Sequence, residues 1–125
     1  MLKILTDEQI DPDIAVATKK RCREISILSL FDWMDGHFVS ASDEEVLREA
    51  SRQGLTLLSY DLRTIPPLLR AWGERGIDHG GVIFVDSKSS AQNDISGISK
   101  ALVELWEVQG KVDWKNRFFY LTPRR

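Results

Sequence analysis

The sequence predicts an α/β fold, a three-layer α/β/α sandwich built on a mainly parallel sheet of about five strands. Short apolar runs alternate along the chain with amphipathic segments, which is the order of elements in βαβ units. The apolar runs are nearly continuous, as in strands that are buried on both faces of a sheet. The 125 residues suit one domain, spanning residues 1–125, which buries roughly two-thirds of its unfolded surface.

Local signals place the first three elements. An apolar run at residues 2–5 predicts a first strand. Asp11 and Pro12 predict a helix start, because aspartate suits the N-cap and proline suits the first helical position. This helix is expected to end in the basic residues 19–23. Residues 25–31 are rich in β-forming side chains and predict the second strand.

The second helix has the best-defined start in the sequence. Ser42 and Glu45 stand at the spacing of a capping box, in which the two side chains satisfy free amides of the first turn. Gly54 ends this helix at the position where a left-handed residue is usual. A third strand is expected at residues 55–60, and Asp61 follows it.

Two further strands and two further helices complete the expected fold. Pro66-Pro67 fits only the first turn of a helix, because proline lacks an amide hydrogen. Residues 82–85 predict the fourth strand. Apolar residues at helical spacing between 95 and 106 predict a long helix that Gly110 ends, and residues 118–121 predict the fifth strand.

The composition excludes several classes of protein. The chain is 42% hydrophobic and 29% charged with a net charge of −2, so it carries no overall positive field that would attract nucleic acid. Its longest apolar stretches are about six residues, whereas a membrane span needs about 18, and no secretory signal pattern is present. Cys22 is the only cysteine, which favours a location in the reducing cytoplasm.

Acidic residues follow several of the predicted strands. Asp7 and Glu8 follow the first strand, Asp61 the third and Asp86 the fourth, and Asp43 opens the second helix. In a parallel sheet these positions meet at one edge, where ligands bind. Clustered carboxylates suit Mg²⁺ or Mn²⁺. The alternative is that each acid only caps a helix or faces solvent in a loop.

A basic cluster lies near the end of the first predicted helix. Lys19, Lys20, Arg21 and Arg23 surround Cys22. Cations at this place stabilise the helix dipole, so a solvated helix end is one interpretation. The other is a local patch that contacts RNA phosphates.

Four segments in a fixed order resemble a known family. They are residues 2–8, residues 41–47, residues 56–61 and residues 80–83. Together they are similar to the PIN-like (PilT N-terminus superfamily) nuclease domain, in its compact toxin-like branch. The resemblance runs from the first predicted strand to the fourth. It implies a divalent-metal-dependent ribonuclease that acts on single-stranded or structured RNA.

The resemblance also implies roles for particular residues. Asp7, Asp43 and Asp61 would hold Mg²⁺ or Mn²⁺, and Glu8 would be a further acid of the site. Ser59 stands where the family usually has threonine, which keeps the hydroxyl. An additional acid of longer family members has no clear counterpart here. The candidates for it are Glu24, Asp32 and Asp35.

The resemblance further implies an antitoxin protein as a possible partner, and exposed aromatic residues would suit a homodimer. Trp33 and Trp114 lie near predicted loops and are the better tryptophan candidates for such a surface, although a structural role is favoured even for these two.

Two other functions remain open on the sequence. One is a PIN-like module that binds RNA or protein without cleaving RNA. The other is a receiver-like signalling domain, which also has an acidic pair after its first strand and an aspartate after its third. Ser87 could supply that family's hydroxyl, but Thr122 and Pro123 stand together without the lysine that receivers place before the proline.

Overall fold

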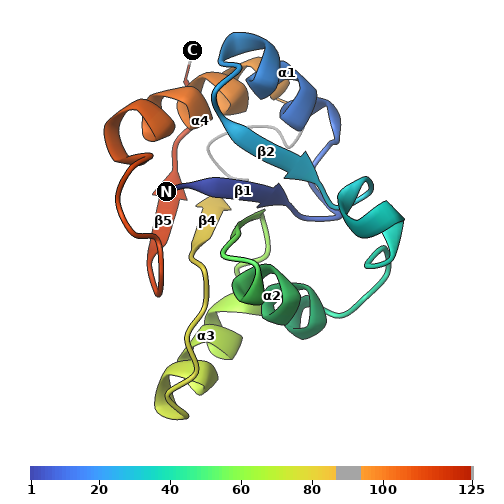
Figure 1. Cartoon of the computed structure of the whole chain (residues 1–125), viewed down its shortest axis with the longest axis vertical. Coiled ribbons are helices and arrows are strands. Elements are labelled where there is room, and N and C mark those ends of the chain that lie inside the picture. Colours follow the sequence, from blue (N-terminus) through green and yellow to red (C-terminus); the bar gives the residue numbers. More distant parts are fainter. Residues whose placement is uncertain (87–93, 125) are drawn as a thin grey trace.

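A five-stranded parallel sheet forms the centre of the protein (Figure 1). The computed structural model describes residues 1–86 and 94–124. The strands lie in the order β2-β1-β3-β4-β5, and all four neighbouring pairs are parallel. Their bounds are Lys3–Thr6 for β1, Ser26–Ser29 for β2, Thr56–Ser59 for β3, Val82–Val85 for β4 and Phe118–Leu121 for β5. The predicted fold class is confirmed.

Four α-helices cover the two faces of this sheet within the described residues (Figure 1). Helices α1 and α4 lie on one face, and α2 and α3 lie on the other. Their bounds are Asp13–Arg21 for α1, Asp43–Arg52 for α2, Ile65–Glu74 for α3 and Ile95–Gln109 for α4, and a short 3₁₀ turn, η1, covers Trp33–Gly36. None of these described helices has the length and apolar character to cross a bilayer.

A separate hydrophobic cluster fills each side of the sheet. Ile4 of β1 packs in the cluster that holds Ile14 of α1 and Leu102 of α4. Its neighbour Leu5 packs in the opposite cluster, which holds Leu47 of α2. This alternation follows from the two-residue period of a strand, and it requires apolar residues at consecutive positions.

The helix starts follow their predicted signals closely. Ser42 is the N-cap of α2, and its hydroxyl accepts the Glu45 amide at 3.2 Å and donates to the Glu45 carboxylate at 3.1 Å. Helix α1 begins at Asp13, slightly later than expected, and the Asp11 carboxylate accepts the Asp13 amide at 2.9 Å. Strand β2 is shorter than the predicted 25–31, because it pairs with β1 over only four residues.

The Gly80-Gly81 turn is required by close packing. Gly81 has a φ of +101°, and an added Cβ would lie 2.6 Å from the carbonyl oxygen of Trp114. The Gly80 amide donates to Ser51 Oγ at 3.1 Å. The turn therefore sets how β4 enters the sheet between β3 and β5.

The two tryptophans considered for a partner surface are buried. Trp33 is 3% exposed and stacks on Phe38 at 4.8 Å between ring centroids, and Trp114 is 4% exposed. Both pack in the hydrophobic clusters beside the sheet, which confirms the favoured structural role and excludes the partner surface for them. The exposed aromatic side chains of the described chain are Phe31, Phe118 and Tyr120.

Candidate functional site

The strand order creates a switch point between β1 and β3. From β1 the chain crosses to β2 on one side and later returns to β3 on the other, so the connections leave the sheet in opposite directions. Asp7 directly follows β1, and Asp61 lies two residues after β3. The Asp7 amide donates to the Leu58 carbonyl at 2.9 Å, which extends the pairing of the two strands to this point.

Asp7 is buried at the carboxyl edge of the sheet. Its side chain is fully engaged: Oδ1 accepts the Glu8 amide at 2.7 Å, and Oδ2 accepts the Ser59 hydroxyl at 2.9 Å. Burial raises the pKa of Asp7, as do the charges of Asp61 and Glu8, while the two hydrogen bonds oppose this rise. Asp7 is therefore a carboxylate held in place by protein donors.

Asp61 organises the turn between β3 and α3. Its Oδ1 accepts the amides of Arg63 and Thr64, both at 2.9 Å, and its own amide donates to Ser59 Oγ at 3.0 Å. Burial alone would raise the pKa of Asp61, but these amides and a side-chain hydrogen bond with Asp43 outweigh it and lower the pKa. Among the three aspartates of this site, Asp61 is the one whose pKa is lowered.

Asp43 is the first residue of α2 and lies half-buried beside Asp61. The pKa of Asp43 is raised to about 6, chiefly by burial and next by a side-chain hydrogen bond with Asp61. The negative charges of Asp7, Asp61 and Glu8 act in the same direction. Residues that are far apart in the sequence thus bring their carboxyl groups into one electrostatic cluster.

The shifts of Asp43 and Asp61 have opposite directions, as expected for two acids that share one proton. Below about pH 6 such a pair places a protonated carboxyl group next to a carboxylate. Environments that separate two pKa values in this way are typical of sites that transfer protons or hold cations.

Glu8 connects this cluster to the loop before α2. Its Oε1 accepts the amide of Ser40 at 2.6 Å, and Ser40 has a left-handed backbone with a φ of +68°. The contact fixes the chain two residues before the N-cap Ser42. Glu8 therefore helps to position Asp43 in addition to adding negative charge.

The residues present fit a hydrated divalent cation better than a closed three-carboxylate cage. Among the described residues, no three Asp, Glu, His or Cys side chains are arranged to hold a metal ion together. Asp7 is buried and both of its oxygens accept protein hydrogen bonds, whereas Asp43 and Asp61 are only partly buried and are therefore the more accessible ligands. Mg²⁺ commonly binds through one or two carboxylates and keeps several waters. That Asp7, Asp43 and Asp61 all bind a metal stays a prediction.

The structure does not bring the basic cluster to these acids. Arg21 and Arg23 lie just before β2, at the amino edge of the sheet, whereas the acids lie at the carboxyl edge. Lys19 Nζ donates to the Ile25 carbonyl at 2.6 Å, and Arg21 Nε donates to Ser99 Oγ at 2.9 Å. Lys20 is exposed on the same last turn of α1. These contacts tie α1 to β2 and α4, and RNA binding by the cluster stays a prediction.

The topology also narrows the search for an additional acid. Glu24 precedes β2 and so lies at the amino edge, with its carboxylate accepting the Cys22 thiol at 3.2 Å. Asp32 and Asp35 follow β2 at the carboxyl edge, and Asp86 follows β4 at that edge. Ser87 lies outside the described residues.

Two contributors to the site were not assigned a role from the sequence. Ser59 links Asp7 to Asp61, and the only sequence signal was a hydroxyl at the place where threonine is usual. The Ser40 amide binds Glu8 through a contact 32 residues apart, for which the sequence gives no local signal.

Comparison with known proteins identifies no relative. No family model, no curated protein and no solved structure matches this chain. The chemistry of the site therefore has to be inferred from its own geometry.

Proposed function

We propose that this protein is a PIN-like ribonuclease that depends on Mg²⁺ or Mn²⁺. The observation that carries the proposal is the hydrogen-bonded pair of Asp43 and Asp61 beside buried Asp7 at the switch point of a parallel sheet. A ribonuclease site needs negative groups that concentrate a divalent cation where a phosphodiester can approach. The order of the sequence segments that resemble the PIN-like domain supports the same function.

Each acid has a separate role in this proposal. Asp43 and Asp61 hold the cation, and Asp7 adds charge and fixes Ser59, which in turn orients the backbone of Asp61. Glu8 holds the loop before α2 through the Ser40 amide. When bound, the cation would lower the pKa of a water and offset charge on the phosphoryl group. Without the cation the pKa of Asp43 is raised to about 6, and a bound cation would favour its ionised form.

We place the protein in the cytoplasm, on the basis of its single cysteine. The resemblance to toxin-like members supports an antitoxin protein as its partner. An acidic, cation-binding edge that an antitoxin covers would be inactive until the antitoxin is removed.

A receiver-like signalling domain is the second candidate, because the order β2-β1-β3-β4-β5 is the order of flavodoxin-like sheets, which receivers share. In that case Asp61 would accept a phosphoryl group. Two observations favour the nuclease. Asp61 Oδ1 already caps the turn into α3, and no lysine stands between Thr122 and Pro123.

Cleavage of a fluorescently labelled single-stranded RNA in millimolar Mn²⁺ tests the proposal. We expect Asp61→Asn and Asp43→Asn each to reduce the cleavage rate by more than about 100-fold. Replacing a residue that only hydrogen-bonds to a metal ligand already lowers activity roughly 10- to 100-fold, and loss of a ligand itself should cost more. Asp86→Asn is the matched control, because Asp86 also follows a strand at this edge. Undiminished cleavage by Asp61→Asn rules out the proposed site. Absence of cleavage by the unaltered protein leaves the PIN-like binding module as the better description.

A further inference from the structure

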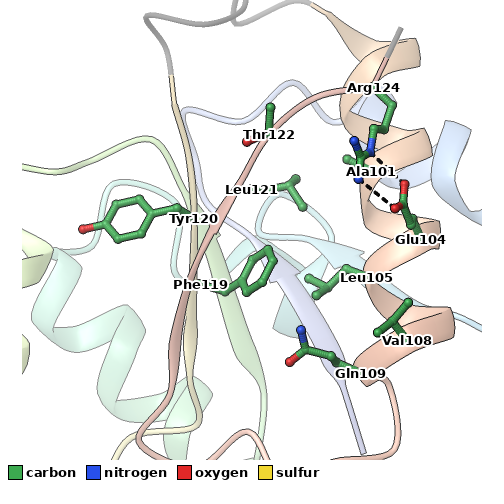
Figure 2. Close-up of a pocket in the computed structure, with 10 residues that line it drawn as sticks. All are labelled: Ala101, Glu104, Leu105, Val108, Gln109, Phe119, Tyr120, Leu121, Thr122 and Arg124. Atoms are coloured by element: carbon green, nitrogen blue, oxygen red, sulfur yellow. Dashed lines mark hydrogen bonds and ion pairs between the residues drawn. The ribbon is translucent and has the colours of Figure 1, made fainter.

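The side chains of β5 face two different environments. Figure 2 shows Phe119 and Leu121 pointing toward α4, whereas Tyr120 points to the opposite face of the sheet. Phe118 lies on the same face as Tyr120, because residues two apart in a strand point the same way. Phe118 is 61% exposed and Tyr120 is 56% exposed. The layer formed by α2 and α3 therefore leaves the face of this edge strand open.

An aromatic groove of about 380 Å³ lies between α3 and β5 on this open face. Pro66 and Arg70 line the groove from α3. Phe84 of β4 and the β5 residues Phe118 and Tyr120 line it from the sheet. Tyr120 stacks on Phe84 with ring centroids 5.6 Å apart and meets Phe118 edge-on at 6.2 Å. Phe84 is buried and supports the Tyr120 ring, so Tyr120 and Phe118 are the two rings exposed to a planar ligand.

The charge of the aromatic groove is positive although the chain is acidic. Among the described residues that line the groove there is no Asp or Glu, and Arg70 is the one with a permanent charge. Arg117, next to Phe118, lies over the Trp114 ring at 5.1 Å and donates to a neutral glutamine. Within the described residues neither arginine is paired with an acid. Residues 110–125 hold five of the 17 Lys and Arg residues but one of the 19 acids.

The far end of the groove offers a directional hydrogen-bond donor. His79 lines the groove, and its Nδ1 accepts the Gly81 amide at 3.0 Å. Burial lowers the pKa of His79 and favours the neutral ring, and because Nδ1 accepts a hydrogen bond the proton of that ring is on Nε2. This N–H can donate to a carbonyl or ring nitrogen at the edge of a nucleobase.

The near end of the groove adjoins the acidic site. Pro66 lies in the first turn of α3 and lines the groove. The turn that leads into this helix is the one that Asp61 caps through Arg63 and Thr64. An extended ligand lying in the groove would therefore run along α3 toward the carboxyl edge of the sheet, where Asp43 and Asp61 are paired.

We propose that the aromatic groove receives unpaired bases of a single-stranded RNA, stacked on Tyr120 and Phe118 with a phosphate at Arg70. The inference rests on the proposed ribonuclease function and assigns the path of its substrate. Aromatic rings bind any base by stacking, and a nearby arginine neutralises the backbone. The groove, not the basic end of α1, is then the surface that recognises RNA.

A second copy of the chain is the competing occupant of this surface. β5 is an edge strand, and edge strands can pair with a strand of another molecule. The positive, acid-free lining favours the polyanion, because strand pairing would use the backbone of β5 and would not need Arg70. The two occupants predict different results for the same variants.

Fluorescence anisotropy of a labelled single-stranded RNA in EDTA tests the proposal without cleavage. We expect Tyr120→Ala and Phe118→Ala each to weaken binding about 5- to 100-fold. Tyr120→Phe should retain binding because it keeps the ring. Arg70→Gln should weaken binding and make it less sensitive to salt. The matched controls are Leu28→Ala, an exposed residue of the other edge strand, and Arg75→Gln at the end of α3.

Two results would overturn the proposal. The first is unchanged RNA affinity in the groove variants, or no RNA affinity in the unaltered protein. The second is a change from dimer to monomer in Tyr120→Ala, measured by light scattering, which would assign the surface to a second copy. If only the ribonuclease proposal is wrong, the result is different. RNA then still binds in EDTA and the binding still depends on Tyr120, but the protein does not cleave RNA in Mn²⁺.

Discussion

The hydroxyl of Ser59 donates to the carboxylate of Asp7 over 2.9 Å, across two neighbouring strands. The same oxygen accepts the amide of Asp61 at 3.0 Å. Ser59 is fully buried and Asp7 nearly so. One small side chain thus joins the ends of β1 and β3, and it does so where the acidic residues gather.

Ser59→Ala should destabilise the protein by about 1–3 kcal/mol, because the buried carboxylate of Asp7 loses a donor and the Asp61 amide loses an acceptor. Urea unfolding measures this loss. Ser26→Ala is the control, since Ser26 is exposed on β2 and should change stability by less than about 0.5 kcal/mol. Equal effects of the two substitutions would show that the Ser59 contact adds no stability.

Divalent cations should stabilise the folded protein. A cation at about one hundred times its Kd adds about 2.7 kcal/mol, which for a chain of this size raises the melting temperature by roughly 8–13 °C. Thermal melts in EDTA and in millimolar Mn²⁺ measure the difference. The physical reason is that the cation relieves the repulsion that acts on Asp43.

Asp43→Asn is the control for this cation effect. The variant removes one of the two available ligands, so its melting temperature should respond much less to Mn²⁺ than that of the unaltered protein. A full increase in melting temperature with Mn²⁺ in the variant would show that the cation binds somewhere other than at Asp43 and Asp61. Identical melts of the unaltered protein with and without Mn²⁺ would favour the module that binds without cleaving.

Most of the fold could be predicted from the sequence because its signals are local. The capping box of Ser42 and Glu45 and the buried apolar runs each report on a few neighbouring residues. The order of the strands and the exposure of β5 depend on which elements pack together. The apolar run 118–121 was therefore predicted as a strand, but not as an edge strand with two exposed rings.

The candidate site could be predicted only in part. The positions of Asp7 and Asp61 at strand ends follow from the parallel sheet, and the capping pattern places Asp43. The hydrogen bonds that decide which carboxylates remain available connect residues 52 and 32 positions apart, namely Asp7 with Ser59 and Glu8 with Ser40. No sequence pattern at this spacing reports such contacts.

Gly81→Ala should destabilise the protein by about 1–3 kcal/mol. Its φ of +101° is unfavourable for any residue with a Cβ, and the new methyl group would meet the Trp114 carbonyl. Chemical unfolding measures the loss. Gly76→Ala is a suitable comparison, because it has a φ of +68° but no described atom within 4 Å of the added Cβ. A similar loss in both variants would assign the effect to backbone conformation alone.

Without metal, the contribution of Asp43 should make the protein less stable as the pH rises from about 4 to 6. The pKa of Asp43 is about 6 in the folded state and 3.8 for an unperturbed aspartate, so in this range the folded protein binds a proton that the unfolded chain has lost. Stability falls with rising pH wherever the folded state binds more protons.

His79 acts in the opposite direction over part of this range. Burial lowers its pKa below 6.5, so the unfolded chain gains a proton first as the pH falls, and this destabilises the folded state. Asp61, whose pKa is lowered, contributes only below its usual pKa of 3.8. The total pH profile therefore mixes several groups, and comparison with Asp43→Asn isolates the contribution of Asp43.

The decisive measurement is the stability of Asp43→Asn minus that of the unaltered protein, from urea unfolding in EDTA between pH 4.5 and 7.5. We expect this difference to increase with pH, because the variant cannot acquire the repelled charge. Solvent screening of the partly exposed carboxyl limits the increase to about 1 kcal/mol. The change should be nearly complete by about pH 7, where Asp43 is ionised in both states. A difference that is independent of pH would mean that Asp43 does not share a proton with Asp61, and the site would lose its main electrostatic support.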